Sequence, residues 1–142
     1  MKKRHFLFPA LFLCSITLLL FCNFRDRSEA SGQGAGSVYD KWPQARFRNF
    51  RVLLATDSEL ACRGFAIASH EDFENTIIIF PNIRENTVFI NRDQGFGAVK
   101  RDLKIVFLDS GMKVLKEDIM KKGDGYSVAP SGARFAIEGL AP

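Results

Sequence analysis

The sequence predicts an α+β domain with a mostly antiparallel, barrel-like sheet and one or two short helices, preceded by a signal helix and a flexible tether. Residues 103–115 alternate as two strands about a turn at Asp109-Ser110-Gly111. Other short stretches rich in β-branched and aromatic residues are separated by turns containing Gly, Pro and Asn. An uncharged apolar run, Phe6–Phe21, precedes all of them.

The charge of the chain is concentrated near its beginning. The net charge is +4 over 142 residues, and residues 1–32 hold five basic and two acidic side chains, which leaves a net of +1 for the rest. A nucleic-acid-binding domain carries its positive charge on the folded part, so we expect no nucleic-acid partner. The basic cluster Arg46–Arg51, with its interleaved Phe residues, is interpreted as an edge strand with a charged outer face.

Residues 1–21 have the pattern of a signal peptide. Basic residues at positions 2–4 precede the apolar run, which as a helix would span about 24 Å, less than the roughly 30 Å of a membrane core. The run ends in Leu19-Leu20-Phe21-Cys22, which resembles the lipobox of bacterial lipoproteins, where a leader is cut before a cysteine that then carries a lipid. Phe21 replaces the usual small residue, a departure typical of spirochaete lipoproteins. Cleavage after Ala30 to a soluble exported protein and an uncleaved anchor are the alternatives.

Residues 22–37 form the predicted tether. The segment is polar and rich in Gly and Ser, so it cannot bury enough apolar surface to offset the entropy of ordering. Once Cys22 is lipidated and Cys14 removed, Cys62 is the remaining thiol, so the sequence offers no disulfide framework. The chain is therefore divided into a signal peptide (1–21), a lipidated cysteine with its tether (22–37) and one domain (38–142). The composition of the whole chain, 46% hydrophobic with 14 Phe residues, indicates that the domain can stand on a hydrophobic core.

The domain is expected to begin with a strand over residues 47–55. A capping box formed by Thr56 and Glu59 starts a short helix that runs to Arg63 and ends at Gly64. Residues 70–75 are expected to form a polar loop or turn, and residues 117–122 a charged segment before a turn at 123–125. The remaining strands are expected at 76–80, 87–91, 103–115 as a hairpin, 126–128 and 134–138.

Five segments in this order resemble domain of unknown function 192, also called uncharacterised protein family 0127. They are the helix containing Glu59 and Arg63-Gly64-Phe65, the strand 77–81 ending in Phe-Pro, the segment 89–92, the hairpin from Leu103 to Gly111 and the strand 135–138. Ile90 and Asn91 stand where that family has Trp and Met, and the chain stops before the family's usual last strand. The resemblance implies the fold and an exported protein, and it supplies no catalytic residue.

The sequence holds no recognisable set of catalytic or metal-binding residues. His70 is the one histidine after the leader, and Cys62 has no histidine near it in sequence, so we expect no metal, no cofactor and no catalytic residue. Asp109 and Glu138 each end an apolar strand, and of the carboxylates in the chain they are the ones whose burial is expected to cost the most free energy. If they converge in a cleft, they are candidates for binding, together with Phe89 and Phe96 beside an apolar groove.

We therefore expect an exported, membrane-tethered lipoprotein that serves as a binding or structural module of the cell envelope, facing the periplasm or the cell surface. Its partner is the membrane, through the lipid anchor, and the ligand or protein that it binds is not indicated by the sequence. The alternative is an envelope enzyme of hydrolase type with a carboxylate-containing cleft. That alternative requires Asp109, Glu138, His70 or Cys62 to converge within hydrogen-bonding distance.

Overall fold

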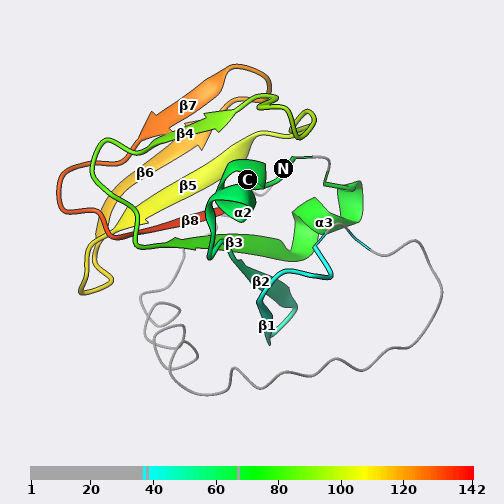
Figure 1. The fold of residues 1–142 in the computed structure, drawn as a ribbon, viewed down its shortest axis with the longest axis horizontal. Coiled ribbons are helices and arrows are strands. Elements are labelled where there is room, and N and C mark those ends of the chain that lie inside the picture. The colour runs from blue at the N-terminus through cyan, green and yellow to red at the C-terminus, as the bar shows by residue number, and fades with distance from the viewer. Residues whose placement is uncertain (1–36, 38, 67) are drawn as a thin grey trace, which may run out of the picture. The chain divides into compact units, whose positions relative to one another are not determined.

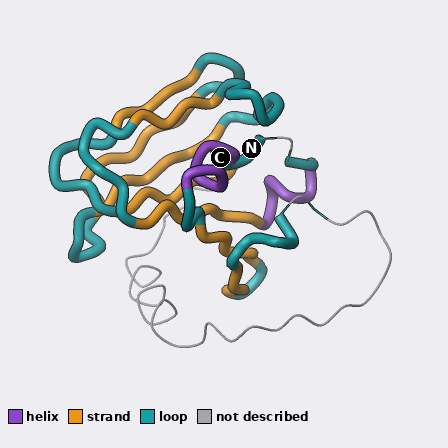
Figure 2. Tube along the Cα trace, in the orientation of Figure 1, coloured by secondary structure: helices purple, strands orange, loops and turns teal. Residues whose placement is uncertain are grey.

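The computed structural model describes residues 37, 39–66 and 68–142. The predicted signal peptide, Cys22 and the tether up to residue 36 lie outside the described residues. The strands are β1 (Gln44–Phe47), β2 (Phe50–Leu54), β3 (Thr76–Pro81), β4 (Val88–Asn91), β5 (Leu103–Leu108), β6 (Val114–Met120), β7 (Gly125–Val128) and β8 (Phe135–Leu140). The helices are α2 (Ser58–Arg63) and α3 (His70–Asn75), as Figures 1 and 2 show.

The strands form a six-stranded sheet in the order β1-β2-β3-β8-β5-β6 and a separate ribbon of β4 and β7. Strands β2 and β3 are parallel, because the chain between them passes through α2 and α3 instead of a hairpin. The other pairs are antiparallel. The α+β class is thus confirmed, but the sheet is mixed and open, with β1 and β6 at its edges, where a barrel-like sheet was expected.

The core lies on one face of the six-stranded sheet. Helix α2 lies over β3 and β8, and the β4–β7 ribbon runs along β5 and β6 (Figure 1). Phe89 of β4 packs edge-on against Phe80 of β3 and Phe107 of β5, with ring centroids 5.0 and 5.6 Å apart. These contacts fix the ribbon above the sheet and leave a space between it and α2. As predicted, β5 is an interior strand, paired with β8 on one side and β6 on the other.

Two expected elements differ at the start of the domain. Residues 47–55 were expected to form one strand, but Arg48 has a φ of 53° and turns the chain, so β1 and β2 form a hairpin. The interpretation of the basic cluster as one charged edge strand holds only for Arg46, which lies on the edge strand β1, because Arg48 lies in the turn and Arg51 lies on the interior strand β2, paired with Asp72. Helix α2 is capped by Asp57, whose Oδ1 accepts from the Leu60 amide at 2.9 Å, and not by the predicted Thr56.

Two further segments, 70–75 and 117–122, have regular structure that the sequence does not predict. Residues 70–75 form α3 because Ser69 and Asp72 make a capping box and Phe73 is buried. The charged segment 117–122 belongs largely to β6, which runs to Met120. Its inward-facing positions include Lys116 and Asp118, so the strand lacks the apolar alternation by which strands are recognised. Within the described residues, no helix is both long and apolar enough to span a membrane.

Candidate functional site

A cavity of about 550 Å³ lies between α2, the β4 strand with the loop that follows it, and the sheet beneath. Its volume falls in the range of roughly 300–1,000 Å³ that is typical of small-molecule sites. Its lining comprises residues 55–58, 61–66, 80–83, 87–90, 92, 94, 96, 99, 103 and 138. The cavity thus draws together segments that are up to 83 residues apart in the chain, from Ala55 to Glu138.

Glu138 belongs to the floor of this cavity. It lies on β8, where Ile78 of β3 and Ile105 of β5 stand directly opposite it. Both isoleucines are fully buried, and Glu138 itself is only 6% exposed. Paired residues of neighbouring strands project to the same face of a sheet, so the carboxyl group stands in an apolar row at the centre of the core face. A strand of this kind would pack more tightly with an apolar residue at that position.

The Glu138 carboxyl has no hydrogen-bond or ion-pair partner among the residues that the structure describes. Burial alone raises its pKa from 4.5 to about 8, and no cation offsets that effect. An ionisable group in such surroundings costs stability, because neither its charge nor its lone pairs are compensated within the protein. The unpaired carboxyl is therefore the most unusual feature of the cavity.

The end of α2 lies directly above this carboxyl. A Cβ atom placed on Gly64 would lie 3.4 Å from Oε2 of Glu138, and Gly64 has a φ of 46°. The nearby Tyr39 hydroxyl donates to the carbonyl oxygen of Gly64 at 3.0 Å, so this donor is already engaged. Burial, and then the negative charges of Asp72 and Glu138, raise the pKa of Tyr39, which stays neutral at physiological pH.

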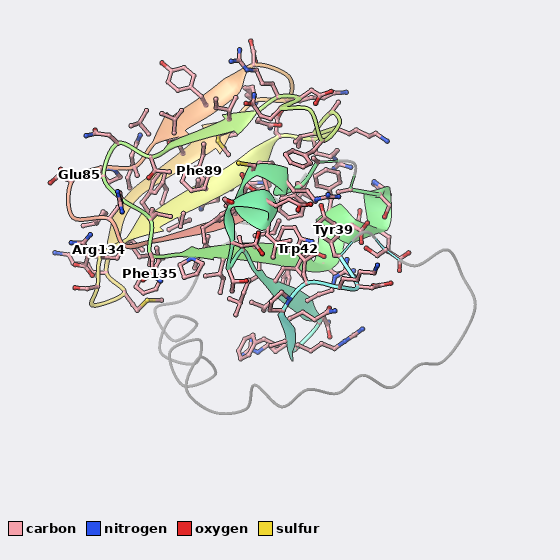
Figure 3. The ribbon with its side chains drawn as sticks, viewed as in Figure 1. Tyr39, Trp42, Glu85, Phe89, Arg134 and Phe135 are labelled. Carbon is pink, nitrogen blue, oxygen red and sulfur yellow. The ribbon has the colours of Figure 1, made fainter. Side chains whose placement is uncertain are left out.

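Aromatic rings and arginines line the walls. Phe89 lies between β4 and the sheet (Figure 3), and Phe96 stands on the loop that follows β4. The Arg63 guanidinium lies 5.2 Å from the centroid of the Phe96 ring and is also 2.9 Å from Oε1 of Glu59. Arg92 contributes a second cationic side chain to the lining. One aromatic face of this wall thus already holds a cation.

The structure brings together three of the four candidate binding residues named from the sequence. Glu138, Phe89 and Phe96 all line the cavity. Asp109 does not, because its Oδ1 accepts from the amides of Gly111 and Lys113, at 2.8 and 2.9 Å, in the turn between β5 and β6. The convergence of Asp109 with Glu138 that would have made a two-carboxylate cleft is therefore absent from the described residues.

The residues that the hydrolase alternative requires are separated as well. His70, at the start of α3, contacts Arg101 through Nδ1 at 3.1 Å and Glu74 through Nε2 at 3.4 Å. Cys62 is exposed on α2 and lines the same cavity as Glu138, without a hydrogen bond to it. Within the part of the chain that the structure describes, no group of three or more His, Cys, Asp or Glu side chains is arranged to hold a metal ion.

Two polar networks, one buried at α3 and one half-buried between β6 and β7, hold elements of the fold together. The carboxylate of Asp72 on α3 accepts hydrogen bonds from Ser69, from Ser37 at 2.9 Å, and from Arg51 of β2. Burial raises the pKa of Asp72, but these hydrogen bonds outweigh burial, and the pKa is lowered. On β6, Asp118 accepts from Lys116 at 2.7 Å and from Ser127 of β7. The carboxylates of both networks are hydrogen-bonded, in contrast to that of Glu138, and the networks stabilise the packing of α3 and of the β4–β7 ribbon.

A second hollow, of about 370 Å³, lies between the loop that follows β3 and the turn that precedes β8. Its lining includes Glu85 and Arg134, which are labelled in Figure 3. Both residues are exposed, and Ala133 is the buried member of the lining, so this hollow contains no buried polar side chain. The cavity beneath α2 is the better candidate for a binding site.

Sequence reasoning missed the parts of the site that come from outside the strands. The contact of Tyr39 with Gly64 and the position of Arg63 over Phe96 depend on how α2 and the loop fold back over the sheet. The one available signal was Gly64 itself, which was recognised as the stop of a helix but not as the point of close approach to Glu138.

Comparison with known proteins supports the fold and leaves the activity open. Neither the protein-family models nor the curated proteins give a match to this chain. The structure is similar to a crystal structure of a protein of unknown function from Novosphingobium aromaticivorans DSM 12444, with a TM-score of 0.52 and 18% sequence identity. The similarity covers 65% of this chain and 64% of that protein, and at this identity it shows a shared fold alone.

Proposed function

We propose that this protein is an exported lipoprotein, tethered to a membrane of the cell envelope through Cys22, whose domain binds a small molecule in the cavity beneath α2. The leader with its lipobox-like end and the Gly- and Ser-rich segment after Cys22 support the tether. The resemblance to domain of unknown function 192 belongs to the same proposal, since the motifs that carry it include α2, β3, β5 and β8.

The binding function rests on one observation, the 6%-exposed carboxyl of Glu138 that faces a cavity of about 550 Å³ without a partner. A buried polar group is retained at a cost in stability, and a ligand that satisfies it recovers that cost as binding energy. The apolar rings around it supply the nonpolar contact area that small-molecule sites ordinarily have.

Binding in the cavity is tested by nuclear magnetic resonance of the isotopically labelled full-length protein in detergent micelles, titrated with a set of small aromatic fragments. The proposal predicts that fragments which bind shift the amide signals of α2, β4 and the centre of β8 together. Fragment binding confined to other surfaces, with these signals unchanged, would contradict it. The amide signal of Glu117 serves as the control. This residue lies on the outer face of the edge strand β6, where its carboxylate is paired with Lys104 at 2.6 Å, and it does not line the cavity.

The tether is tested by metabolic labelling with a palmitate analogue. We predict that the native chain takes up the label and sediments with membranes, and that Cys22→Ala abolishes the label and releases the protein. Cys62→Ala serves as the matched control, because this thiol lies in the folded domain, and it should leave labelling unchanged. If Cys22→Ala retains both label and membrane association, lipidation at Cys22 is wrong.

A further inference from the structure

The chemistry of the cavity floor narrows the class of ligand. Glu138 is the buried polar side chain of the lining that lacks a partner among the described residues. Nearby, the Tyr39 hydroxyl is engaged with Gly64, Asp57 with the Leu60 amide and Arg63 with Glu59, while Arg92 is an exposed cation of the lining. An ionised carboxylate accepts hydrogen bonds at about four lone-pair sites and donates none. At pH 7 the carboxyl is mostly protonated and can also donate, but a cationic donor stabilises its ionised form, and the charge-assisted hydrogen bond between them is the strongest that this group can make.

We infer that the cavity takes a small organic ammonium compound with an apolar, preferably aromatic, body, its N–H groups donating to the Glu138 carboxylate and its body packed against Phe89 and Phe96. This inference rests on the proposed function, because it assumes that the cavity is the binding site. It names what the proposed function leaves open, the charge and the hydrogen-bonding character of the ligand.

A cation fits this position better than a neutral hydrogen-bonding group. An amide side chain in place of Glu138 would serve a neutral ligand equally well and would avoid the cost of a buried ionisable group. A carboxylate contributes in addition a negative charge on an apolar floor, where buried Ile78 and Ile105 flank it on both sides. In such surroundings the attraction between opposite charges is screened far less than in solution.

The walls are compatible with a cation and an aromatic body. Arg63 already lies over the face of Phe96, which demonstrates that a cation is accommodated beside this ring. Arg63 is compensated by Glu59, so its repulsion of an incoming ammonium group is reduced. Phe89 packs edge-on against two other rings, and aromatic bodies favour the same offset or edge-to-face contacts.

The pH dependence of binding follows from the groups that surround Glu138. Those that line or border the cavity are Tyr39 from the segment before β1, Asp57, Cys62 and Arg63 from α2, and Arg92 from the loop after β4. Because the pKa of Glu138 is about 8, the carboxyl is mostly protonated at pH 7, and an ammonium ligand must displace its proton. Linkage then predicts that binding at pH 7 releases a proton, and that the affinity rises on the order of 10- to 100-fold from pH 6 to pH 8.

Three probes of similar shape test the inference: phenethylammonium, 2-phenylethanol and 3-phenylpropionate, which are a cation, a neutral donor and an anion. Their affinities for the full-length protein in detergent micelles are measured by isothermal titration calorimetry at pH 6, 7 and 8, in two buffers of different ionisation enthalpy. We expect phenethylammonium to bind at least ten times more tightly than the alcohol at pH 8, with proton release. Glu138→Gln should remove both the preference and the proton release, and Glu117→Gln should leave them unchanged.

The outcomes separate this inference from the function on which it rests. Equal or tighter binding of the alcohol, or of the propionate, would overturn the ammonium assignment while keeping the cavity as a binding site. Binding of none of the three to the native protein would count against the cavity itself, and so against the proposed function. A cation preference that persists in Glu138→Gln would overturn the role of the carboxylate.

Discussion

Replacement of Glu138 by glutamine changes one property of the core and leaves its shape intact. The amide has the size of the carboxyl but does not ionise. In the unfolded chain Glu138 loses its proton near its ordinary pKa of 4.5, whereas in the folded protein its pKa is about 8. Between these two values the folded state binds the proton and the unfolded state does not, so the free energy of unfolding falls as the pH rises.

The size of this effect follows from the two pKa values. Each pH unit in the window lowers the free energy of unfolding by about 1.4 kcal/mol. Over the interval from 4.5 to about 8, the native protein therefore loses roughly 5 kcal/mol relative to Glu138→Gln, as an upper limit. Below pH 4.5 this contribution vanishes, and above pH 8 it is constant, so the difference between the two proteins has a sigmoidal dependence on pH.

Urea unfolding of both full-length proteins, followed by the fluorescence of Trp42 at half-unit steps from pH 4.5 to pH 9, measures this difference. Trp42 is the one tryptophan of the chain and is buried beside Tyr39, so it reports on the core. All other ionisable groups are common to the two proteins and cancel in the comparison. If the two stability curves stay parallel across this range, the burial of an unpaired Glu138 carboxyl is refuted.

Three other substitutions test the surroundings of the site. Tyr39→Phe removes the buried donor to Gly64 and should lower the free energy of unfolding by about 1–3 kcal/mol; no loss in urea unfolding would mean that this bond is not formed. Asp72→Asn should lower the free energy of unfolding by about 2–3 kcal/mol at pH 7. Because the pKa of Asp72 in the folded protein lies below 3.8, this loss should shrink only as the pH falls through that acid range. A loss that does not change with pH in urea unfolding would contradict the role given to the charge of Asp72. Asp109→Ala should cost about 1 kcal/mol through the turn and leave probe binding unchanged, whereas weakened binding would return Asp109 to the site.

The strands with strong apolar patterns were predictable from the sequence. Residues 76–81 and 103–108 carry β-branched and aromatic side chains on both faces, and they became β3 and β5 in the interior of the sheet. The edge strands were harder, because β1 and β6 carry polar and charged side chains that suit a sheet edge. The pairing of β2 with β3 in parallel depends on the path of the intervening helices, which local patterns do not encode.

The candidate site was predictable in its residues but not in its geometry. Glu138 is a candidate from the sequence because burial of a carboxylate at the end of an apolar strand is costly, and the structure buries it. Asp109 had the same pattern, yet its carboxylate is satisfied by the amides of its own turn. Sequence alone does not distinguish these two cases, because the difference lies in which backbone groups the fold leaves within reach.

The ionisation of the Glu138 carboxyl is the most direct test of the proposed binding site. Carbon-13 nuclear magnetic resonance of the full-length protein labelled at glutamate Cδ, with Glu138→Gln to assign the signal, follows this one group with pH. We predict a midpoint near pH 8 in the free protein and a marked fall of this midpoint when phenethylammonium is present at saturation. A midpoint near 4.5, or one that the ammonium probe does not move, would contradict it.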